Sequence, residues 1–305
     1  MPQTRTLTAP QAGPITIDAS LLGAHGTVTI RTDRTIKAAE IAIRTTDESG
    51  PSADAVHGAR LQWDARGALV AHVKGNGSQG TNLVTGTGGI HVVQNFGVIT
   101  GTVTGVVITG NGNSVTVGGR RADSRQGVVT LPSSSPIEIT ARVPEGSSVL
   151  VRTHSGDILA TGTFAAVAAT TQSGEVSVPG KAEQVTASTQ SGAIDVNDSP
   201  SLHVQTQSGG IRLGRTDVAE ATTMSGSVTV ADFGGTARLN TMSGAIRVHA
   251  NAGGDITAKS MSGSITVTAT DQAQADGLDV KANSMSGRVT TPQRRSISGP
   301  RRRTS

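Results

Sequence analysis

Eight serines, each followed by a glycine, are the residues of this 305-residue chain that most resemble a repeated reactive group. A serine nucleophile needs a neighbouring base and a group that orients the base, whereas repetition of one dipeptide indicates structure. The chain has no G-x-S-x-G turn and no phosphate-binding loop. The Ser-Gly pairs therefore predict corners of a repeating fold, and they begin at Ser155, Ser173, Ser191, Ser208, Ser225, Ser243, Ser262 and Ser286.

Other residues that could carry chemistry are no better supported. The sequence GNGSQG at residues 75–80 fits a dinucleotide-binding turn, but the required acidic residue about 20 positions later is missing. The seven histidines make no metal-binding spacing. Asp157, Glu175 and Asp195 neighbour one another too loosely to predict the carboxylate cluster of a polysaccharide-cleaving enzyme. We therefore expect a non-enzymatic protein with no cofactor and no metal.

The composition excludes several classes of binding protein. Only four residues are aromatic, namely Trp63, Phe96, Phe164 and Phe233, so stacking of nucleic-acid bases and aromatic-lined pockets are not expected. The absence of cysteine excludes disulfides and thiol nucleophiles. With 39 glycines and only 16% charged residues, the chain favours turns and strands over helices.

The elements that position the Ser-Gly pairs follow from one shared pattern. Consecutive serines lie 17–19 residues apart, apart from a last interval of 24. Positions are counted here from the serine of each Ser-Gly pair, which is position 0. Aliphatic residues lie at −6 and −4, Thr or Ser at −2, Gly at +1, and Ile or Val at +3. This period of two predicts strand, corner and strand with one buried face, and so short a unit must stack on its neighbours to bury that face. We predict an all-β fold, a parallel β-solenoid (β-helix) of about eight coils over residues 137–290, with right-handed winding.

Residues at the same position in successive repeats form a column along the stack. Two of these columns are expected to have a structural role. The Thr or Ser at −2 shares the buried phase, so we expect its hydroxyls to hydrogen-bond from coil to coil. The glycine at +1 is needed where a side chain would clash or where φ must be positive. These corner glycines are Gly156, Gly174, Gly192, Gly209, Gly226, Gly244, Gly263 and Gly287.

The −1 column is the candidate contact strip. After His154 it contains three glutamines and then four methionines, which include every methionine except Met1. If the column points outward, it forms a docking strip for a protein partner or a second copy. If the corner turns it inward, it fills the core. Its members are Gln172, Gln190, Gln207, Met224, Met242, Met261 and Met285.

The remaining segments are assigned around the solenoid. Residues 1–74 are predicted to form a small antiparallel β unit that caps one end, with a loop at residues 49–58. Residues 75–136, rich in Gly, Thr and Val, are predicted to be a β connector able to form irregular coils. Residues 291–305 hold five arginines and no acid, and we expect a disordered tail. Contact of this tail with nucleic acid or anionic lipid is the alternative.

The sequences VPEGSSVLVRTHSGDILATG at residues 143–162, TQSGEVSV, TQSGAIDV, TMSGSVTV and SMSGSITV resemble a bacterial β-strand-repeat family of unknown function, commonly labelled "putative adhesin". The resemblance covers residues 137–292, and 15–74 more loosely. It implies a solenoid-like β fold without an assigned reaction or catalytic residues. The chain departs from the family in having no recognisable export signal, and it has no apolar run that could span a membrane.

These observations lead to one functional hypothesis with two alternatives. We expect a cytoplasmic, non-enzymatic, adhesin-like protein that presents a surface for contact with another protein. The first alternative is a self-assembling scaffold, because stacked coils leave ends to which another copy can add. The second alternative is a protein that binds or acts on polysaccharides.

Overall fold

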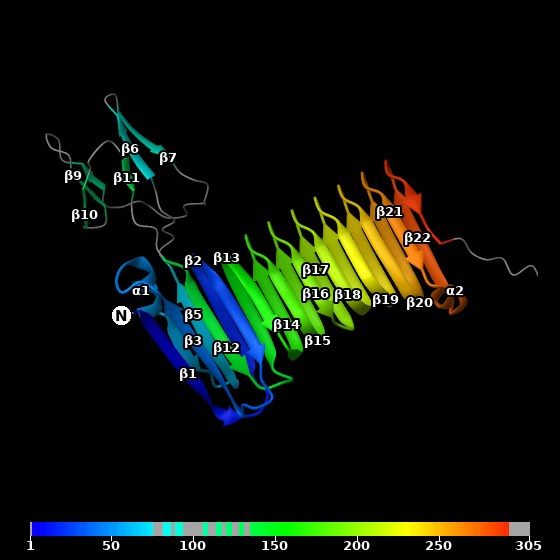
Figure 1. Cartoon of the computed structure of the whole chain (residues 1–305), viewed down its shortest axis with the longest axis horizontal. Coiled ribbons are helices and arrows are strands. Elements are labelled where there is room, and N and C mark those ends of the chain that lie inside the picture. The colour runs from blue at the N-terminus through cyan, green and yellow to red at the C-terminus, as the bar shows by residue number, and fades with distance from the viewer. Residues whose placement is uncertain are drawn as a thin grey trace, which may run out of the picture.

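The fold is all-β, and in the computed structural model most strands stack side by side along one axis (Figure 1). The structure describes residues 2–75, 82–86, 89–93, 106–108, 114–117, 120–123, 128–130 and 135–292. Seventeen strands are hydrogen-bonded into one sheet that wraps around the core. Those of the repeat region are β13 (Ser148–Thr161), β14 (Thr163–Thr171), β15 (Val176–Thr189), β16 (Ile194–Asp198), β17 (Ser201–Thr206), β18 (Ile211–Thr223), β19 (Val228–Thr241), β20 (Ile246–Ser260), β21 (Ile265–Ala269), β22 (Leu278–Ser284) and β23 (Val289–Thr290).

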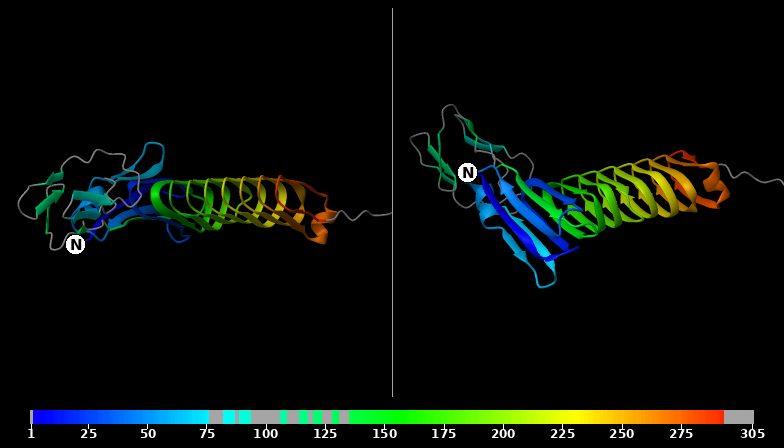
Figure 2. Two further views of the ribbon diagram at one scale, coloured as in Figure 1. Left: turned by 90° about the horizontal axis from the view of Figure 1, so that it is seen from above. Right: turned by 60° about the horizontal axis from the view of Figure 1, so that its bottom comes forward.

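Each strand of the repeat pairs in parallel with its equivalent one repeat later. Val149 lies opposite Val167, Val167 opposite Val185, and Val185 opposite Leu202. The residues before each Ser-Gly build one face of the stack, here called the first face, and the residues after it build the second face. The two faces enclose a core of small aliphatic side chains, as the period-two pattern predicts. The further views show the coils succeeding one another along the rod (Figure 2).

The stack begins earlier in the sequence than residue 137. Strand β2 (Thr16–Thr32) pairs in parallel with β13 along both faces, from Thr16 opposite Ser148 to Arg31 opposite Thr161. Residues 16–32 carry the alternation and the glycine corner of a repeat, with His25-Gly26 lying opposite Ser155-Gly156. They therefore form a coil of the solenoid. The prediction of an antiparallel unit over residues 1–74 is wrong for β2, which pairs in parallel with β13. The Ser-Gly pattern does not include this coil, because a histidine stands where the other corners have serine.

The antiparallel strands of the N-terminal region lie beyond this first coil. On the second face, β12 (Ile137–Val143) pairs in parallel with β2, and β3 (Ala38–Thr45) and β1 (Gln3–Ala12) follow antiparallel. On the first face, β5 (Ala68–Lys74) pairs in parallel with β2, and β4 (Arg60–Trp63) follows antiparallel. Strands β1 and β4 contact each other and so bring the two faces together at this end.

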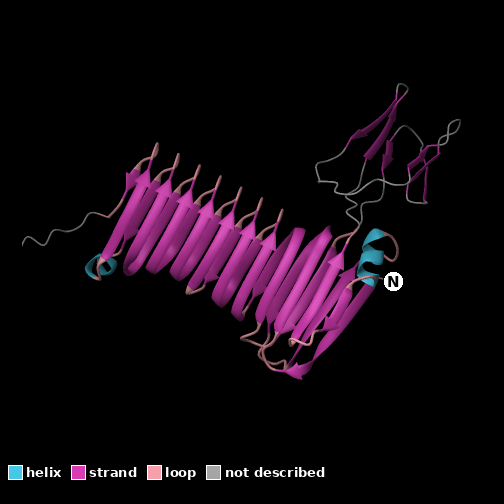
Figure 3. Cartoon of the chain, turned by 180° about the vertical axis from the view of Figure 1, so that it is seen from behind, coloured by secondary structure: helices cyan, strands magenta, loops and turns pink. Residues whose placement is uncertain are grey.

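The predicted loop at residues 49–58 is wrong, because it contains helix α1 (Pro51–His57). Proline is favoured in the first helical turn, since its missing N–H has no partner there anyway. Val56 is fully buried against the core. The Arg5 guanidinium on β1 donates to the His57 carbonyl at 2.9 Å and also to the Ala59 carbonyl, which satisfies the C-terminal end of the helix. Figure 3 shows α1 beside the N-terminus.

The described strands of residues 75–136 pair antiparallel in two small sheets, so they do not continue the stack as irregular coils. One sheet contains β6 (Asn82–Gly86), β7 (Gly89–Val93) and β11 (Val128–Thr130). The other contains β8 (Val106–Ile108), β9 (Ser114–Val117) and β10 (Arg120–Asp123). Of the GNGSQG sequence only Gly75 is described, and the arginine tail beyond residue 292 also lies outside the described residues.

The 24-residue interval before Ser286 is explained by a second short helix. Helix α2 (Asp271–Ala275) is inserted where the other coils turn directly from the second face to the first. The Thr270 hydroxyl caps the helix by accepting a hydrogen bond from the Ala273 N–H at 3.1 Å, and Ala273 is fully buried. The extra residues are thus accommodated at a corner and leave the strand register intact. Among the described residues, neither helix is long and apolar enough to cross a membrane.

Candidate functional site: the Ser-Gly edge

The Ser-Gly corners stack into one edge of the rod, and the glycine column explains how closely they stack. A Cβ atom added at these glycines would lie between 1.7 and 2.8 Å from the carbonyl oxygen of the equivalent glycine in the preceding coil. None of the eight has a positive φ. Of the two reasons for glycine predicted from the sequence, the structure therefore supports the clash with the neighbouring backbone.

The buried hydroxyl column lies directly behind this edge. The hydroxyl at −2 donates to the glycine carbonyl of the preceding coil, for example Thr223 Oγ1 to Gly209 O at 3.3 Å and Thr241 Oγ1 to Gly226 O at 3.2 Å. The expected coil-to-coil hydrogen bonds are thus confirmed, with backbone carbonyls as the repeated acceptors. Thr153 differs, because its hydroxyl bonds to Gly156 O of its own coil at 2.8 Å and to Thr171 Oγ1 of the next coil at 2.9 Å. The ladder satisfies polar groups that would otherwise be buried without partners.

Replacing Thr223 with valine should lower the free energy of unfolding by about 1–2 kcal/mol, because the side chain keeps its shape while the Gly209 carbonyl loses its donor. The measurement is urea denaturation followed by circular dichroism. The matched control is Thr222→Val, which changes the adjacent, half-exposed side chain and should alter stability by less than about 0.5 kcal/mol. Equal effects of the two substitutions would contradict a stabilising role for the ladder.

The candidate contact strip lies on the outside of this edge. Met224, Met242 and Met261 keep 49%, 47% and 47% of their surface exposed, and Met285 keeps 77%. Gln172, Gln190 and Gln207 are exposed as well. The two orientations left open by the sequence are thus distinguished, because the described side chains of the column face solvent. Such exposure of four methionines in one row is costly for an isolated surface.

The methionine part of the strip forms a shallow apolar groove. Its volume is about 260 Å³, and it is lined by Met224, Ser225, Met242, Ser243, Met261 and Ser262. The main chain beneath it is already paired, since the Ser243 N–H donates to the Met224 carbonyl and the Ser262 N–H to the Met242 carbonyl, both at 2.9 Å. Only the side chains are therefore available for contact, namely flexible thioethers and serine hydroxyls.

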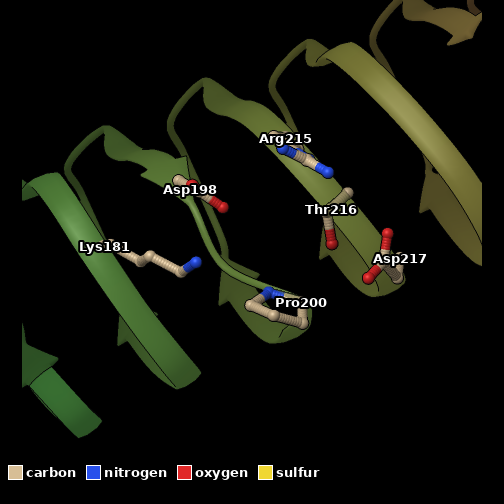
Figure 4. Close-up of a pocket in the computed structure, with 6 residues that line it drawn as sticks. All are labelled: Lys181, Asp198, Pro200, Arg215, Thr216 and Asp217. Carbon is tan, nitrogen blue, oxygen red and sulfur yellow. The ribbon is translucent and has the colours of Figure 1, made fainter.

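A second hollow of about 210 Å³ lies at the opposite corner of the rod and is lined by charged side chains (Figure 4). Lys181, Asp198, Arg215 and Asp232 follow one another in register on successive coils. Opposite charges on adjacent strands stabilise pairing by about 0.2–1 kcal/mol each. Three of the four charged residues that line the hollow, Lys181, Asp198 and Arg215, belong to this alternating column, which favours the observed strand register.

The residues considered for catalysis or metal binding are not gathered into a site. Asp157 Oδ1 accepts a hydrogen bond from the backbone N–H of Glu175 at 2.9 Å, so it holds the next coil in place. Asp195 belongs to a different outward column, opposite Ser177. Within the described ranges, no three His, Cys, Asp or Glu side chains are grouped as metal ligands.

The chain has the following similarities to known proteins. No curated protein matches the chain. Among solved structures, it is similar to a "putative lipid binding protein" from Parabacteroides distasonis, with 16% identity and a TM-score of 0.47 over 96% of this chain and 97% of that one. It is also similar to a "putative adhesin" from Bacteroides fragilis, with 13% identity and a TM-score of 0.40 over 96% and 97% of the two chains. Another "putative adhesin", from Parabacteroides merdae, is 9% identical with a TM-score of 0.33 over 96% of each chain.

The family assignment rests on the repeat region itself. The eight corner glycines, the hydroxyls at −2 and the parallel register of strands β13 to β23 all lie within the matched residues, whereas β2 and β5 precede them. The resemblance predicted from the Ser-Gly repeats is confirmed at the level of the family. Residues 100–302, more than half of the chain, match the family described as Toastrack DUF4097, and the chain belongs to that family.

Proposed function

We propose that this protein is a non-enzymatic β-solenoid whose Ser-Gly edge is a contact surface for another protein. The observation that carries the proposal is the row of four methionines exposed by 47–77% over a groove of about 260 Å³. Methionine side chains adapt to differently shaped partners, because they are unbranched and polarisable. The right-handed winding of the coils belongs to the same proposal and is supported by the general preference of parallel crossovers.

The surroundings of the groove favour a protein rather than a charged polymer as the partner. Most outer side chains next to the methionines are uncharged, and two, Lys259 beside Met261 and Arg288 beside Met285, are exposed cations. The uncharged neighbours are Thr222, Ser227, Asn240, Ala245, Ser264 and Asn283. A nucleic acid would be bound by a row of cations along its phosphates. An apolar centre with a mainly uncharged polar border and only two cations at its rim is typical of protein interfaces.

The test begins with a photo-crosslinking residue placed at position 242, in cells of the source organism, followed by identification of the attached protein. The affinity of the purified partner is then measured for the double variant Met242→Ser/Met261→Ser. We expect the dissociation constant to rise about tenfold or more, because truncating central contact residues costs over 1 kcal/mol each.

The matched control is Val218→Ser, which removes a 51% exposed apolar side chain outside the strip and should leave the affinity unchanged. Both variants should unfold at nearly the wild-type urea concentration, since the altered side chains are exposed. An unchanged affinity of the double variant would refute the proposed contact surface. A large loss of stability would instead assign the methionines to the core.

A further inference from the structure

The two ends of the rod differ in how they are finished. At the N-terminal end, β1 and β4 contact each other and α1 packs on β1, β3 and β5. At the other end, β22 pairs only with β20 and β23 only with β21 among the described strands. One edge of the last coil is therefore not covered by any described strand of this chain.

The core is correspondingly incomplete at the last coil. Leu278, Val280 and Ala282 are only partly buried, whereas Ile256 and Ala258, which lie opposite Val280 and Ala282 one coil earlier, are 1% and 0% exposed. Val289 on the second face is 39% exposed. A strand edge with an apolar inner face strongly favours the addition of another strand.

We propose that β22 pairs antiparallel with β22 of a second copy, so that two rods join end to end about a two-fold axis that passes by Val280. This axis puts Val280 opposite the partner's Val280 and Leu278 opposite the partner's Ala282. A large side chain then meets a small one on the inner side, which allows the two incomplete cores to close over each other. The two-fold axis runs perpendicular to the sheet, so that the side chains of β22 that face the core in one copy lie on the same side of the sheet as those of the other copy.

The outward side chains of β22 provide the argument for a second copy rather than a different partner. Asp279 and Lys281 flank Val280, and within one chain their Oδ2 and Nζ atoms lie 3.5 Å apart. In the antiparallel pairing, Asp279 lies opposite the partner's Lys281, and Lys281 lies opposite the partner's Asp279. The charge pattern of this strand is thus complementary to itself, and opposed charges on neighbouring strands favour pairing.

The structure also limits the association to two copies. An interface of this type uses the same patch on both chains and closes after two copies. At the opposite end of each rod, the described strands β1 and β4 contact each other and α1 packs against β1, β3 and β5, so the core there is not open as it is at β22. On the second face, β23 has only two residues and is followed by Pro292, which cannot donate a ladder hydrogen bond. The pairing is therefore centred on β22.

The test uses the full-length chain in sedimentation velocity over a range of concentrations. The wild type should pass from monomer to dimer. Asp279→Lys places lysines opposite lysines, and Lys281→Asp places aspartates opposite aspartates. Each single variant should dimerise about tenfold more weakly or worse, because the two-fold axis repeats every substitution. The double variant Asp279→Lys/Lys281→Asp should restore the dimer, and an equimolar mixture of the two single variants should form a mixed dimer.

Several results would overturn the proposal. One is a wild type that stays monomeric at every concentration, which is expected if residues 293–305 of the same chain cover the edge. Another is growth of the wild type into species larger than a dimer. Failure of the double variant or of the mixture to recover association would do the same. Met242→Ser/Met261→Ser should dimerise like the wild type, so a loss of dimer in that variant would place self-association on the Ser-Gly edge instead. The dimer and the proposed contact surface can therefore fail independently.

Discussion

Replacing Gly209 with alanine is expected to destabilise the protein by about 3 kcal/mol, at the upper end of overpacking substitutions. The added Cβ would lie 1.8 Å from the carbonyl oxygen of Gly192 in the preceding coil. Because that carbonyl belongs to the main chain of a hydrogen-bonded corner, it cannot rotate away as a flexible side chain would. Two coils must move apart, which also lengthens the hydrogen bond from Thr206 Oγ1 to Gly192 O. Urea denaturation followed by circular dichroism measures the loss.

The neighbouring residue offers a matched control for this prediction. A Cβ added at Gly210 would meet nothing nearer than the Ser227 backbone oxygen and hydroxyl at 3.9 Å, and Gly210 does not have a positive φ. Gly210→Ala should therefore be neutral, or stabilising by about 0.4–1 kcal/mol through the reduced freedom of the unfolded chain. If both alanines were tolerated equally, the close approach of the corners would not be the reason for the glycine column.

Replacing Phe233 with alanine should cost about 3–5 kcal/mol of unfolding free energy. Phe233 is fully buried at the corner opposite Ser-Gly, and its neighbours in register are the much smaller Thr216 and Ala250. No large side chain next to it in this column can move into the space, so the cavity would persist. Calorimetric or urea unfolding of the variant measures the effect.

Phe233→Leu is the control for side-chain volume. It should lower the free energy of unfolding by less than about 1.5 kcal/mol, because most of the buried apolar volume remains. A small effect of Phe233→Ala would contradict the prediction by showing that the corner collapses around the missing ring. Phe164 occupies a similar position, fully buried and opposite Ala182. These two phenylalanines thus lie at corners, whereas the straight strands of the repeat region bury aliphatic side chains.

The repeat region could be predicted from the sequence because every coil presents the same pattern. The aliphatic, hydroxyl and glycine columns each have one role that repeats at the spacing of the coils, so eight copies reinforce a single interpretation. The structure adds what such a pattern cannot contain, namely the acceptor of each hydroxyl and the clash that excludes a side chain at positions such as Gly244.

The N-terminal coil and helix could not be predicted in the same way, because each occurs once. The coil of β2 has His25 where the other corners have serine, and it is separated from its sequence relatives by more than 100 residues. Aligning on glycine rather than on Ser-Gly would have revealed it. Helix α1 is stabilised by Arg5, which is 46 residues before its first residue, so local propensity alone does not indicate it.

The direction of the contact strip could not be inferred because residues beside a tight corner do not keep a reliable alternation. Thr241 at −2 is buried, and Met242 at −1 is 47% exposed. The hydrogen bond of Thr241 to the preceding coil fixes the inward residue and thereby the outward orientation of its neighbour. The phase of the column is set by a long-range contact rather than by the local sequence.

The contrast between the finished and the open end also affects how the protein loses its structure. Each coil is bonded only to the coil on either side, as in other repeat proteins, so its stability depends on its nearest neighbours. In the monomer the last coil, formed by β22 and β23, has one such neighbour, and its amide protons should exchange with solvent first. Partial unfolding should therefore shorten the rod from this end, one coil at a time, while the part next to the N-terminal end stays folded.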